Sequence, residues 1–174
     1  MRCFVACWPD DTTRNRLDRV ASAMLPRCPG ARRINAANLH LTLAFIGELP
    51  LSGAHEAASA LRSIPSEPFD WRIDRVGRFD RARVLWAGGA EEDARLADLA
   101  GRVRGCLQAL RIRFDTKAFV AHVTLLRDLP GRHRSESADA AEPVDPFVWP
   151  IQAANMLVSE RDPRGATRYR VLDA

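Results

Sequence analysis

The sequence predicts an α+β fold with two similar lobes, each an antiparallel sheet with helices packed outside, and a cleft between the lobes. Three observations support this prediction. Apolar segments typical of strands are interspersed with three amphipathic helical segments. The pattern His-x-Thr-Leu occurs at 40–43 and again at 122–125, each time inside an apolar run. The two copies are 82 positions apart and each follows a helical segment, which is the order that an internal duplication would leave.

The first half of the chain contains signals for two helices and three strands. Asp10 is a suitable N-cap for a helix with apolar residues every three or four positions, and Pro26 ends it. Gly47 and Pro50 interrupt the apolar run that holds the first His-x-Thr-Leu copy, so the next helix begins after them. The expected elements are a strand near 2–8, a helix between 10 and 26, strands near 31–34 and 40–46, and a helix over 52–64.

The second half of the chain contains signals for a hairpin, a long helix, a strand and a loop. Apolar and charged residues alternate at the start of the hairpin, as in a strand with one buried face. The helix has an apolar line at helical spacing and acidic residues in its first turn, where the helix dipole favours them. The expected elements are strands at 69–74 and 84–87 with a turn at 80–83, a helix over 91–110, a strand over 119–126, and a mobile surface loop over 130–146.

The duplicated pattern predicts a site for acid–base chemistry. Side chains alternate along a strand, so His40 shares a face with Thr42, and His122 shares a face with Thr124. If the two strands lie side by side, two imidazoles and two hydroxyls converge with no carboxylate or thiolate among them. That set suits proton transfer on two sides of a bound anion, and therefore phosphate chemistry. A single histidine in such a strand is more often a core residue bonded to a backbone carbonyl; the duplication favours a site.

The composition is typical of a soluble globular protein with one domain spanning 1–174. Hydrophobic residues make up 47% and charged residues 28%, and no apolar stretch approaches the ~20 residues that a membrane span needs. The first apolar run stops at Pro9, too early for a secretory signal, so we expect a cytoplasmic protein. The net charge of +4, carried almost entirely by arginine, favours polyanionic partners, although a compositional bias toward arginine explains it equally well.

Neither the cysteines nor the other histidines predict a metal site. The four cysteines lack Cys-x-x-Cys spacing, and we expect buried, reduced thiols. His55 lacks the second histidine of a zinc-binding His-Glu-x-x-His motif. His133 lies in the irregular segment and is expected to be solvated. The expectation is therefore no metal and no cofactor.

The segments around both copies resemble the two signatures of the 2H phosphoesterases, in particular the bacterial and archaeal RNA 2',3'-cyclic phosphodiesterases once called 2'-5' RNA ligases. Those segments are Asn38–Glu48 and Ala121–Arg127. Further similarity covers 1–6, 77–79, 84–88, and 157–161 together with Tyr169. The sequence departs from the family pattern in three places: Ala121 replaces a usual proline, Arg33 falls near a usual tryptophan, and Ser159 and Glu160 are in swapped order.

The resemblance implies hydrolysis of a terminal 2',3'-cyclic phosphate at its 3' oxygen, leaving a 2'-phosphomonoester. It favours His122 as the base for water and His40 as the acid for the 3' oxygen, an order that the residues alone do not decide. Thr42 and Thr124 are expected to donate hydrogen bonds to the non-bridging oxygens. The last two expected substrate-binding residues are Phe45, to stack a base, and Arg127, to hold a phosphate. Core packing for the phenylalanine and an exposed salt bridge for the arginine are the alternatives.

The expected partners are RNA ends or nucleotides that carry a 2',3'-cyclic phosphate, and the protein is expected to be a monomer that does not bind membranes. Two other functions stay open. The same histidines can join tRNA halves through a 2',5' linkage, although water at high concentration favours hydrolysis in an open cleft. A basic cleft can also bind RNA ends without catalysis. The physiological substrate is left open.

Overall fold

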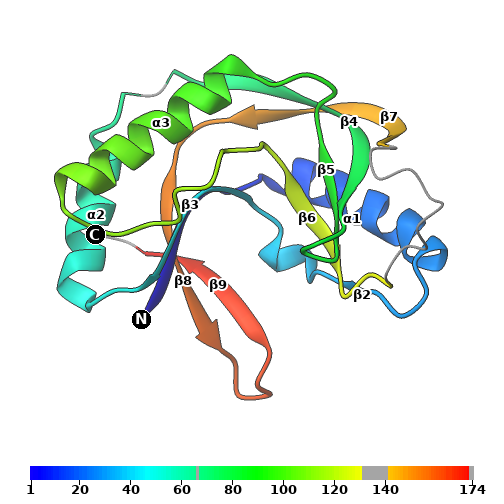
Figure 1. Ribbon diagram of the computed structural model, residues 1–174, viewed down its shortest axis with the longest axis horizontal. Helices are drawn as coiled ribbons and strands as arrows, with labels where there is room; N and C mark the ends of the chain where they lie inside the picture. Colours follow the sequence, from blue (N-terminus) through cyan, green and yellow to red (C-terminus); the bar gives the residue numbers. More distant parts are fainter. Residues whose placement is uncertain (66, 131–140, 173–174) are drawn as a thin grey trace.

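The computed structural model describes residues 1–65, 67–130 and 141–172 (Figure 1). The helices are α1 (Asp11–Met24), α2 (Leu51–Arg62) and α3 (Ala94–Ala109), with short 3₁₀ helices η1 (Leu25–Arg27) and η2 (Ala36–Asn38). The strands are β1 (Arg2–Cys7), β2 (Arg32–Arg33), β3 (Leu41–Glu48), β4 (Phe69–Phe79), β5 (Val84–Gly88), β6 (Val123–Arg127), β7 (Glu142–Ile151), β8 (Asn155–Arg161) and β9 (Thr167–Val171).

The strands of the described residues form one nine-stranded antiparallel sheet in the order β7-β4-β5-β6-β3-β1-β8-β9, with β2 against β6. The order is symmetric about the contact between β3 and β6, where Leu41 pairs with Val123. Each lobe is thus a set of four strands, β9-β8-β1-β3 on one side and β6-β5-β4-β7 on the other. The predicted α+β fold with two antiparallel lobes is confirmed. The lobes meet directly after the two signature histidines.

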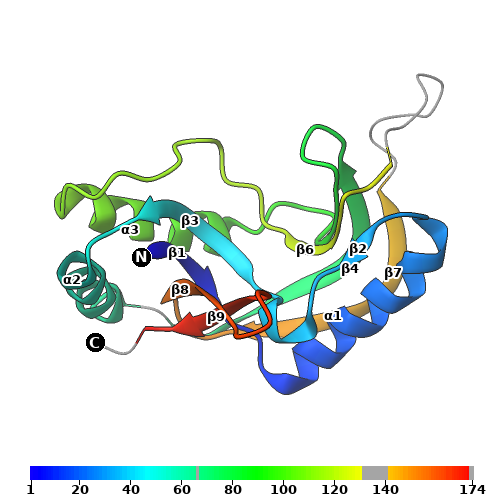
Figure 2. The ribbon, with the colours of Figure 1, turned by 90° about the horizontal axis from the view of Figure 1, so that it is seen from below.

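The helices cover the sheet in an exchanged arrangement. Helix α1 follows β1 but packs on β6 and β7 of the other lobe, whereas α3 follows β5 but packs on β3 (Figures 1 and 2). Helix α2 packs on β8 and on α3. The chain order β1-α1-β3 is the same as β5-α3-β6, as a duplication predicts. Each lobe therefore buries its sheet under a helix that belongs to the other half of the repeat.

Local signals explain most element boundaries. The Asp10 carboxylate accepts a hydrogen bond from the Thr13 amide (2.7 Å), which caps α1 as predicted. Pro26 follows the end of α1 and lies within η1. The Asp93 carboxylate caps α3 through the Arg95 amide (2.9 Å), so this helix begins three residues later than its acidic run suggests. The hairpin of β4 and β5, with its turn at 80–83, is confirmed.

The prediction of a loop over 130–146 is wrong where strand β7 begins, at Glu142. Residues 131–140 lie outside the described part of the chain. Strand β7 contains Pro143, Pro146 and Pro150, which removed the usual strand signal. Proline is tolerated there because β7 is the first strand in the sheet order, and an edge strand needs fewer backbone donors. The second signature strand is also shorter than predicted, since β6 begins at Val123.

The main core lies between the sheet and the helices, and a smaller apolar cluster lies on the opposite face of β1, β8 and β9. Alternation along β1 sends Cys3, Val5 and Cys7 into the main core and Phe4 and Ala6 into the second cluster. The other members of that cluster are Trp8, Leu157, Tyr169 and Val171. The second cluster therefore covers the sheet face that looks into the cleft.

All four cysteines are free: Cys3, Cys7 and Cys28 are buried, and Cys106 is partly buried. Burial raises the pKa of the Cys7 thiol to about 12, which makes this thiol unreactive. The expected burial is thus found for three of the four cysteines, and their reduced state stays a prediction. Among the described residues, no helix has the length and apolar character needed to cross a bilayer.

Candidate active site

His40 and His122 lie just before β3 and β6, and both rings are held in the same way. Nδ1 of His40 donates to the backbone carbonyl of Asn38 (2.7 Å), and Nδ1 of His122 donates to that of Val120 (2.7 Å). A carbonyl oxygen only accepts hydrogen bonds, so each Nδ1 carries the proton. Nε2 is therefore the nitrogen that each ring has available for a substrate.

The strand register brings the two signatures together on one face. Leu41 and Val123 pair and are both fully buried, so the residues on either side of them project to the other face, toward the cleft. One step from this pair, His40 comes opposite Thr124, and Thr42 comes opposite His122. This makes His40 and His122 diagonal neighbours across the two antiparallel strands. Such neighbours are roughly 7–8 Å apart, so a phosphate group fits between the two side chains.

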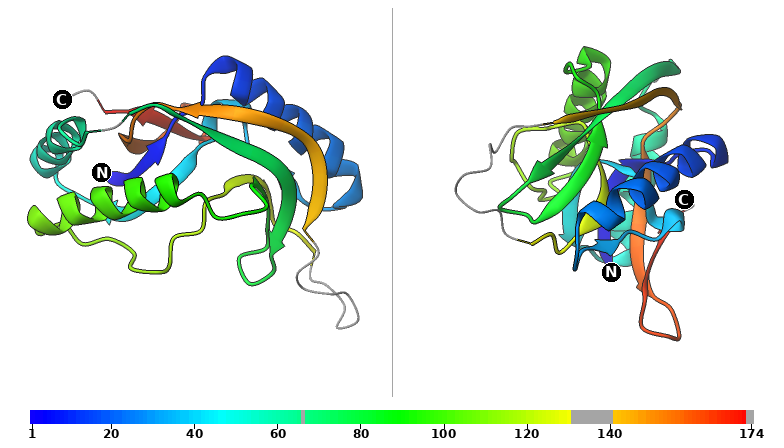
Figure 3. Two further views of the ribbon diagram at one scale, coloured as in Figure 1. Left: turned by 90° about the horizontal axis from the view of Figure 1, so that it is seen from above. Right: turned by 90° about the vertical axis from the view of Figure 1, so that its right-hand side faces the viewer.

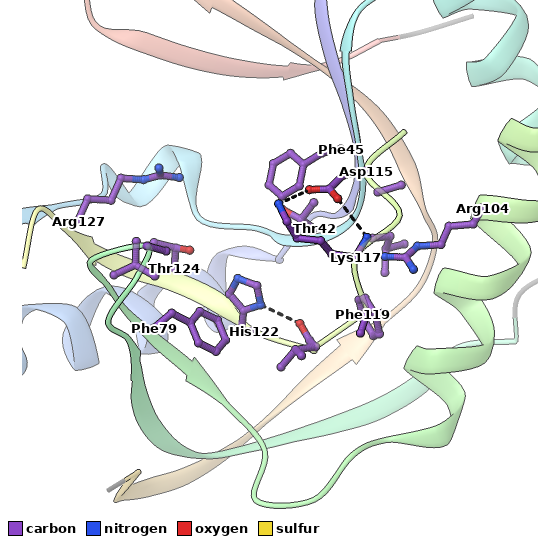
Figure 4. A pocket seen from close by; sticks show the side chains of 16 residues that line it. Thr42, Phe45, Phe79, Arg104, Asp115, Lys117, Phe119, His122, Thr124 and Arg127 are labelled. Carbon is purple, nitrogen blue, oxygen red and sulfur yellow. Dashed lines mark hydrogen bonds and ion pairs between the residues drawn. The ribbon is translucent and has the colours of Figure 1, made fainter. Parts of the chain in front are cut away.

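Two adjoining cavities lie over this face. The His122 cavity, of about 340 Å³, is lined by His122, Thr42 and Thr124 (Figure 4). The His40 cavity, of about 730 Å³, contains His40. The two cavities share Phe45, Asp115 and Arg127. All six residues expected from the sequence therefore line at least one of the two cavities: His40, Thr42, Phe45, His122, Thr124 and Arg127.

Phe45 and Arg127 lie where the two cavities meet. Phe45 is 53% exposed, so it is not a core residue. The Arg127 side chain is also exposed, and none of the described residues forms an ion pair with it. Its charge acts on the pKa values of both histidines. The alternative of an exposed salt bridge at Arg127 thus has no partner within the described residues.

Both imidazoles are held in the neutral state. Burial lowers the pKa of His40 to about 4; the carbonyl of Asn38 opposes this shift, and the charges of Arg127 and His122 add to it. Burial also lowers the pKa of His122, opposed by the carbonyl of Val120 and reinforced by Arg127. A bound anion acts in the opposite direction on both rings, because it stabilises their protonated forms.

Aromatic rings surround His40. Its ring centroid lies 4.9 Å from that of Phe4 and 5.2 Å from that of Tyr169, which meets it edge-on at 87°. Trp8 is stacked on His40 at 6.5 Å and 17°. Three aromatic rings thus limit the contact of the His40 ring with water.

His122 has a matching edge-on contact with Phe79, at 5.0 Å and 86°. The sequence does not predict Phe79 as a site residue, because an aromatic residue in a strand is more often in the core. Phe79 also packs against Trp86 at 5.4 Å. Trp86 lies over Gly77, where a Cβ would come within 2.3 Å of the indole. Gly77 therefore leaves room for the Trp86 indole, which packs against Phe79 and holds it beside His122.

Asn38 connects His40 to the edge of the first lobe. Its side chain is buried, donates to the carbonyl of Thr167 (2.7 Å) and accepts from the amide of Tyr169 (3.1 Å). The side-chain amide of Asn38 thus bonds to the backbone of β9 as a neighbouring strand would. The backbone carbonyl of Asn38 holds the His40 ring. Val120, the corresponding residue before His122, is apolar and 48% exposed. The first histidine is therefore more firmly positioned.

The loop between α3 and β6 supplies cavity residues that the sequence did not indicate. The Asp115 amide donates to the carbonyl of Phe45 (2.8 Å), which fixes this loop against β3. Lys117 donates to the Asp115 carboxylate (2.9 Å), and both side chains line the His122 cavity with Arg104 (Figure 4). Arg104 lies on α3. No local pattern marked Asp115 and Lys117, because their position depends on the loop that the Phe45 carbonyl holds against β3.

The described residues contain no group of three or more His, Cys, Asp or Glu side chains suited to hold a metal ion. His55 lies on α2 and lines neither cavity. His133 lies outside the described residues.

Comparison with known proteins gives consistent matches. A model of the LigT-like phosphoesterase family matches residues 8–86. The RNA 2',3'-cyclic phosphodiesterase of Escherichia coli is 34% identical over 149 residues, which are 81% of this chain and 77% of that protein. The protein of the same name from Archaeoglobus fulgidus is 31% identical over 145 residues, which are 82% of this chain and 78% of that one.

The fold matches as well as the sequence does. The crystal structure of E. coli LigT complexed with 3'-AMP aligns with a TM-score of 0.81 and 26% identity, covering 99% of this chain and 95% of that one. A second structure, that of E. coli LigT complexed with phosphate, aligns with a TM-score of 0.76 and 28% identity, covering 99% and 94%. The resemblance seen in the two signatures thus extends over the whole fold, and the chain belongs to the LigT-like family of 2H phosphoesterases.

Proposed function

We propose that this protein hydrolyses the 2',3'-cyclic phosphate ends of RNA or nucleotides to 2'-phosphomonoesters without a metal ion. The observation that carries the proposal is the pair of His–Thr units on one face of the strand junction, with the same ring nitrogen available from each histidine. The relatives named RNA 2',3'-cyclic phosphodiesterase support the substrate class.

The two histidines transfer protons on opposite sides of the phosphorus atom. Nε2 of His122 takes a proton from water as the water oxygen attacks phosphorus. The bond from phosphorus to the 3' oxygen breaks, and Nε2 of His40 donates a proton to that oxygen, leaving the phosphate on the 2' oxygen. His40 is neutral in the free protein, so it gains this proton once the bound substrate anion raises its pKa. Each imidazole contributes about 10²- to 10⁴-fold in rate.

The other four site residues hold the substrate in this proposal. The hydroxyls of Thr42 and Thr124 donate to the non-bridging oxygens, where negative charge increases in the transition state. Arg127 binds the phosphate from the junction of the cavities, and a guanidinium without an ion-pair partner among the described residues suits that role. The exposed ring of Phe45 stacks a base, a contact worth roughly 1–3 kcal/mol.

The test is turnover of a short RNA with a 2',3'-cyclic phosphate end in the presence of EDTA, with the product mapped by phosphorus NMR. The wild type is expected to give a 2'-phosphate, and His40→Gln and His122→Gln are expected to lower kcat by about 10²- to 10⁴-fold. His55→Gln, which removes a histidine outside both cavities, is the control and keeps full activity. Turnover that needs added metal, a 3'-phosphate product, or full activity of His40→Gln would contradict the proposal.

Two further measurements test the other two functions: incubation with tRNA halves, and binding of the same RNA end. Joined products from tRNA halves would demonstrate ligation, and binding of the RNA end without turnover would identify a non-catalytic module. We further propose that the protein is a cytoplasmic monomer with one two-lobed domain. Both cavities are lined by one chain, and the exchanged helices tie the lobes together. Light scattering behind size exclusion chromatography tests the monomer, and a single unfolding transition tests the single domain.

A further inference from the structure

The His40 cavity extends beyond the reacting centre, along the cleft face of β1, β8 and β9. Because side chains alternate, Arg2 lies on the same face of β1 as Phe4, a member of the second cluster. In the same way, Ser159 and Arg161 share a face of β8 with Leu157. These polar side chains line the His40 cavity. The floor of the cavity thus changes from aromatic near the histidine to polar and basic farther away.

The strand register orders these side chains by distance from the reacting centre. Tyr169 is 5.2 Å from the His40 ring and pairs with Ser159, which pairs with Arg2 on β1. Arg161 lies two residues farther along β8, about 7 Å at the rise of a strand. The β8–β9 hairpin continues outward from the body of the protein (Figures 1 and 3). We name this set of residues the basic strip: Arg2, Ser159, Arg161 and Thr167.

The charges of the His40 cavity favour an anionic ligand. Its two carboxylates are already paired with cations that do not line it: Glu160 with Arg170 (2.8 Å) and Asp115 with Lys117 (2.9 Å). The guanidinium groups that line the cavity and have no ion-pair partner among the described residues are those of Arg2, Arg127 and Arg161. Arg127 lies at the reacting centre, so the other two are available for charges farther along the substrate.

The direction of the reaction decides which part of an RNA lies in this cavity. If His40 protonates the 3' oxygen, the ribose attached to that oxygen lies on the His40 side, and the chain continues from its 5' carbon. We propose that the basic strip binds the phosphodiester backbone of the RNA upstream of the cyclic phosphate end. This inference rests on the proposed function and on His40 as the acid. An oligonucleotide is then a better substrate than a mononucleotide with the same end.

The test compares kcat/KM for a 2',3'-cyclic mononucleotide with that for a single-stranded oligonucleotide ending in the same cyclic nucleotide. The ratio is expected to favour the oligonucleotide. In Arg161→Gln and Arg2→Gln, the ratio is expected to fall by about tenfold. The salt dependence of the oligonucleotide reaction is also expected to decrease, by about 0.7 in the log–log slope for each phosphate that the variant no longer neutralises. Arg168→Gln is the matched control, because Arg168 lies on the same hairpin but does not line the cavity.

The outcomes separate the failure of the proposed function from the failure of the basic strip. A wild type that turns over neither substrate contradicts the proposed function itself. A wild type that turns over the mononucleotide but does not prefer the oligonucleotide leaves that function intact and overturns the basic strip. An equal loss in Arg168→Gln and Arg161→Gln overturns it too, as a general charge effect. A selective loss in Arg104→Gln and Lys117→Gln instead would place the RNA chain in the His122 cavity and overturn both the strip and the assignment of the acid.

Discussion

The partly buried, neutral imidazole of His40 makes the stability of the protein depend on pH. The pKa of His40 is about 4 in the folded protein, below the value of about 6.5 for an exposed imidazole. Between these pH values the unfolded chain binds a proton that the folded protein does not, so acidification favours unfolding. The contribution of His40 is complete above pH 6.5 and is lost as the pH falls to 4. From pH 7 to pH 5 the free energy of unfolding is expected to fall by at most about 2 kcal/mol on account of His40.

The measurement is urea unfolding of the wild type and of His40→Gln at pH 7, 6 and 5, followed by tryptophan fluorescence. His122 and the carboxylates of Asp93 and Asp115 also contribute less stability on acidification, because the first has a pKa lowered by burial and the others have partners that lower theirs. Those contributions remain in the variant. The difference between the two proteins therefore isolates His40, whatever constant offset the substitution adds.

The expected result is a pair of curves that converge toward low pH, with the variant losing less stability than the wild type. His55→Gln is the control and is expected to follow the wild type with a constant offset. If His40→Gln also runs parallel to the wild type, the histidine is not held neutral by burial. A larger fraction of His40 would then be protonated near neutral pH before the substrate binds.

Three further predictions follow from single contacts. Asn38→Ala removes both bonds to β9, and we expect a loss of about 1–3 kcal/mol in unfolding free energy and a lower kcat; an unchanged kcat would contradict its role in positioning the histidine. Gly77→Ala is expected to cost about 1–3 kcal/mol because its Cβ meets Trp86, whereas Gly101→Ala, with open space on α3, is expected to stabilise by about 0.4–1 kcal/mol; thermal unfolding compares them. Phe45→Ala is expected to lower kcat/KM by about five- to 150-fold, and equal loss on a substrate with an abasic end would exclude stacking.

The parts of the site that the sequence predicted depend on local patterns. Alternation alone places His40 with Thr42 and His122 with Thr124, whatever the rest of the chain does. The aromatic contacts depend on longer-range pairing. Tyr169 reaches His40 only because β9 pairs with β8, β8 with β1 and β1 with β3. A single sequence holds no signal for that order, so Tyr169 was recognised only through family resemblance.

The fold shows the same division between local and distant information. Helices with clear caps and apolar lines were predicted to within a few residues, since each depends on its own segment. Strand β7 was not predicted: its first residues were assigned to a loop and no strand was expected over 147–151, because its prolines are acceptable only at the edge of the sheet. The exchange of α1 and α3 between the lobes was not predicted either, because an amphipathic helix shows that it covers a sheet but not which one.

The identical attachment of the two imidazoles has a consequence for the direction of catalysis. Each ring offers the same nitrogen, held from behind by a carbonyl two residues earlier, so neither histidine is built exclusively as donor or acceptor. Polarity must come from the surroundings: a roomier chamber that continues to Arg2 and Arg161 on the flank of His40, and a smaller one lined by Arg104 and Lys117 on the flank of His122. Evolution could therefore redirect such a duplicated centre toward new substrates by remodelling the chamber walls while leaving both histidines untouched.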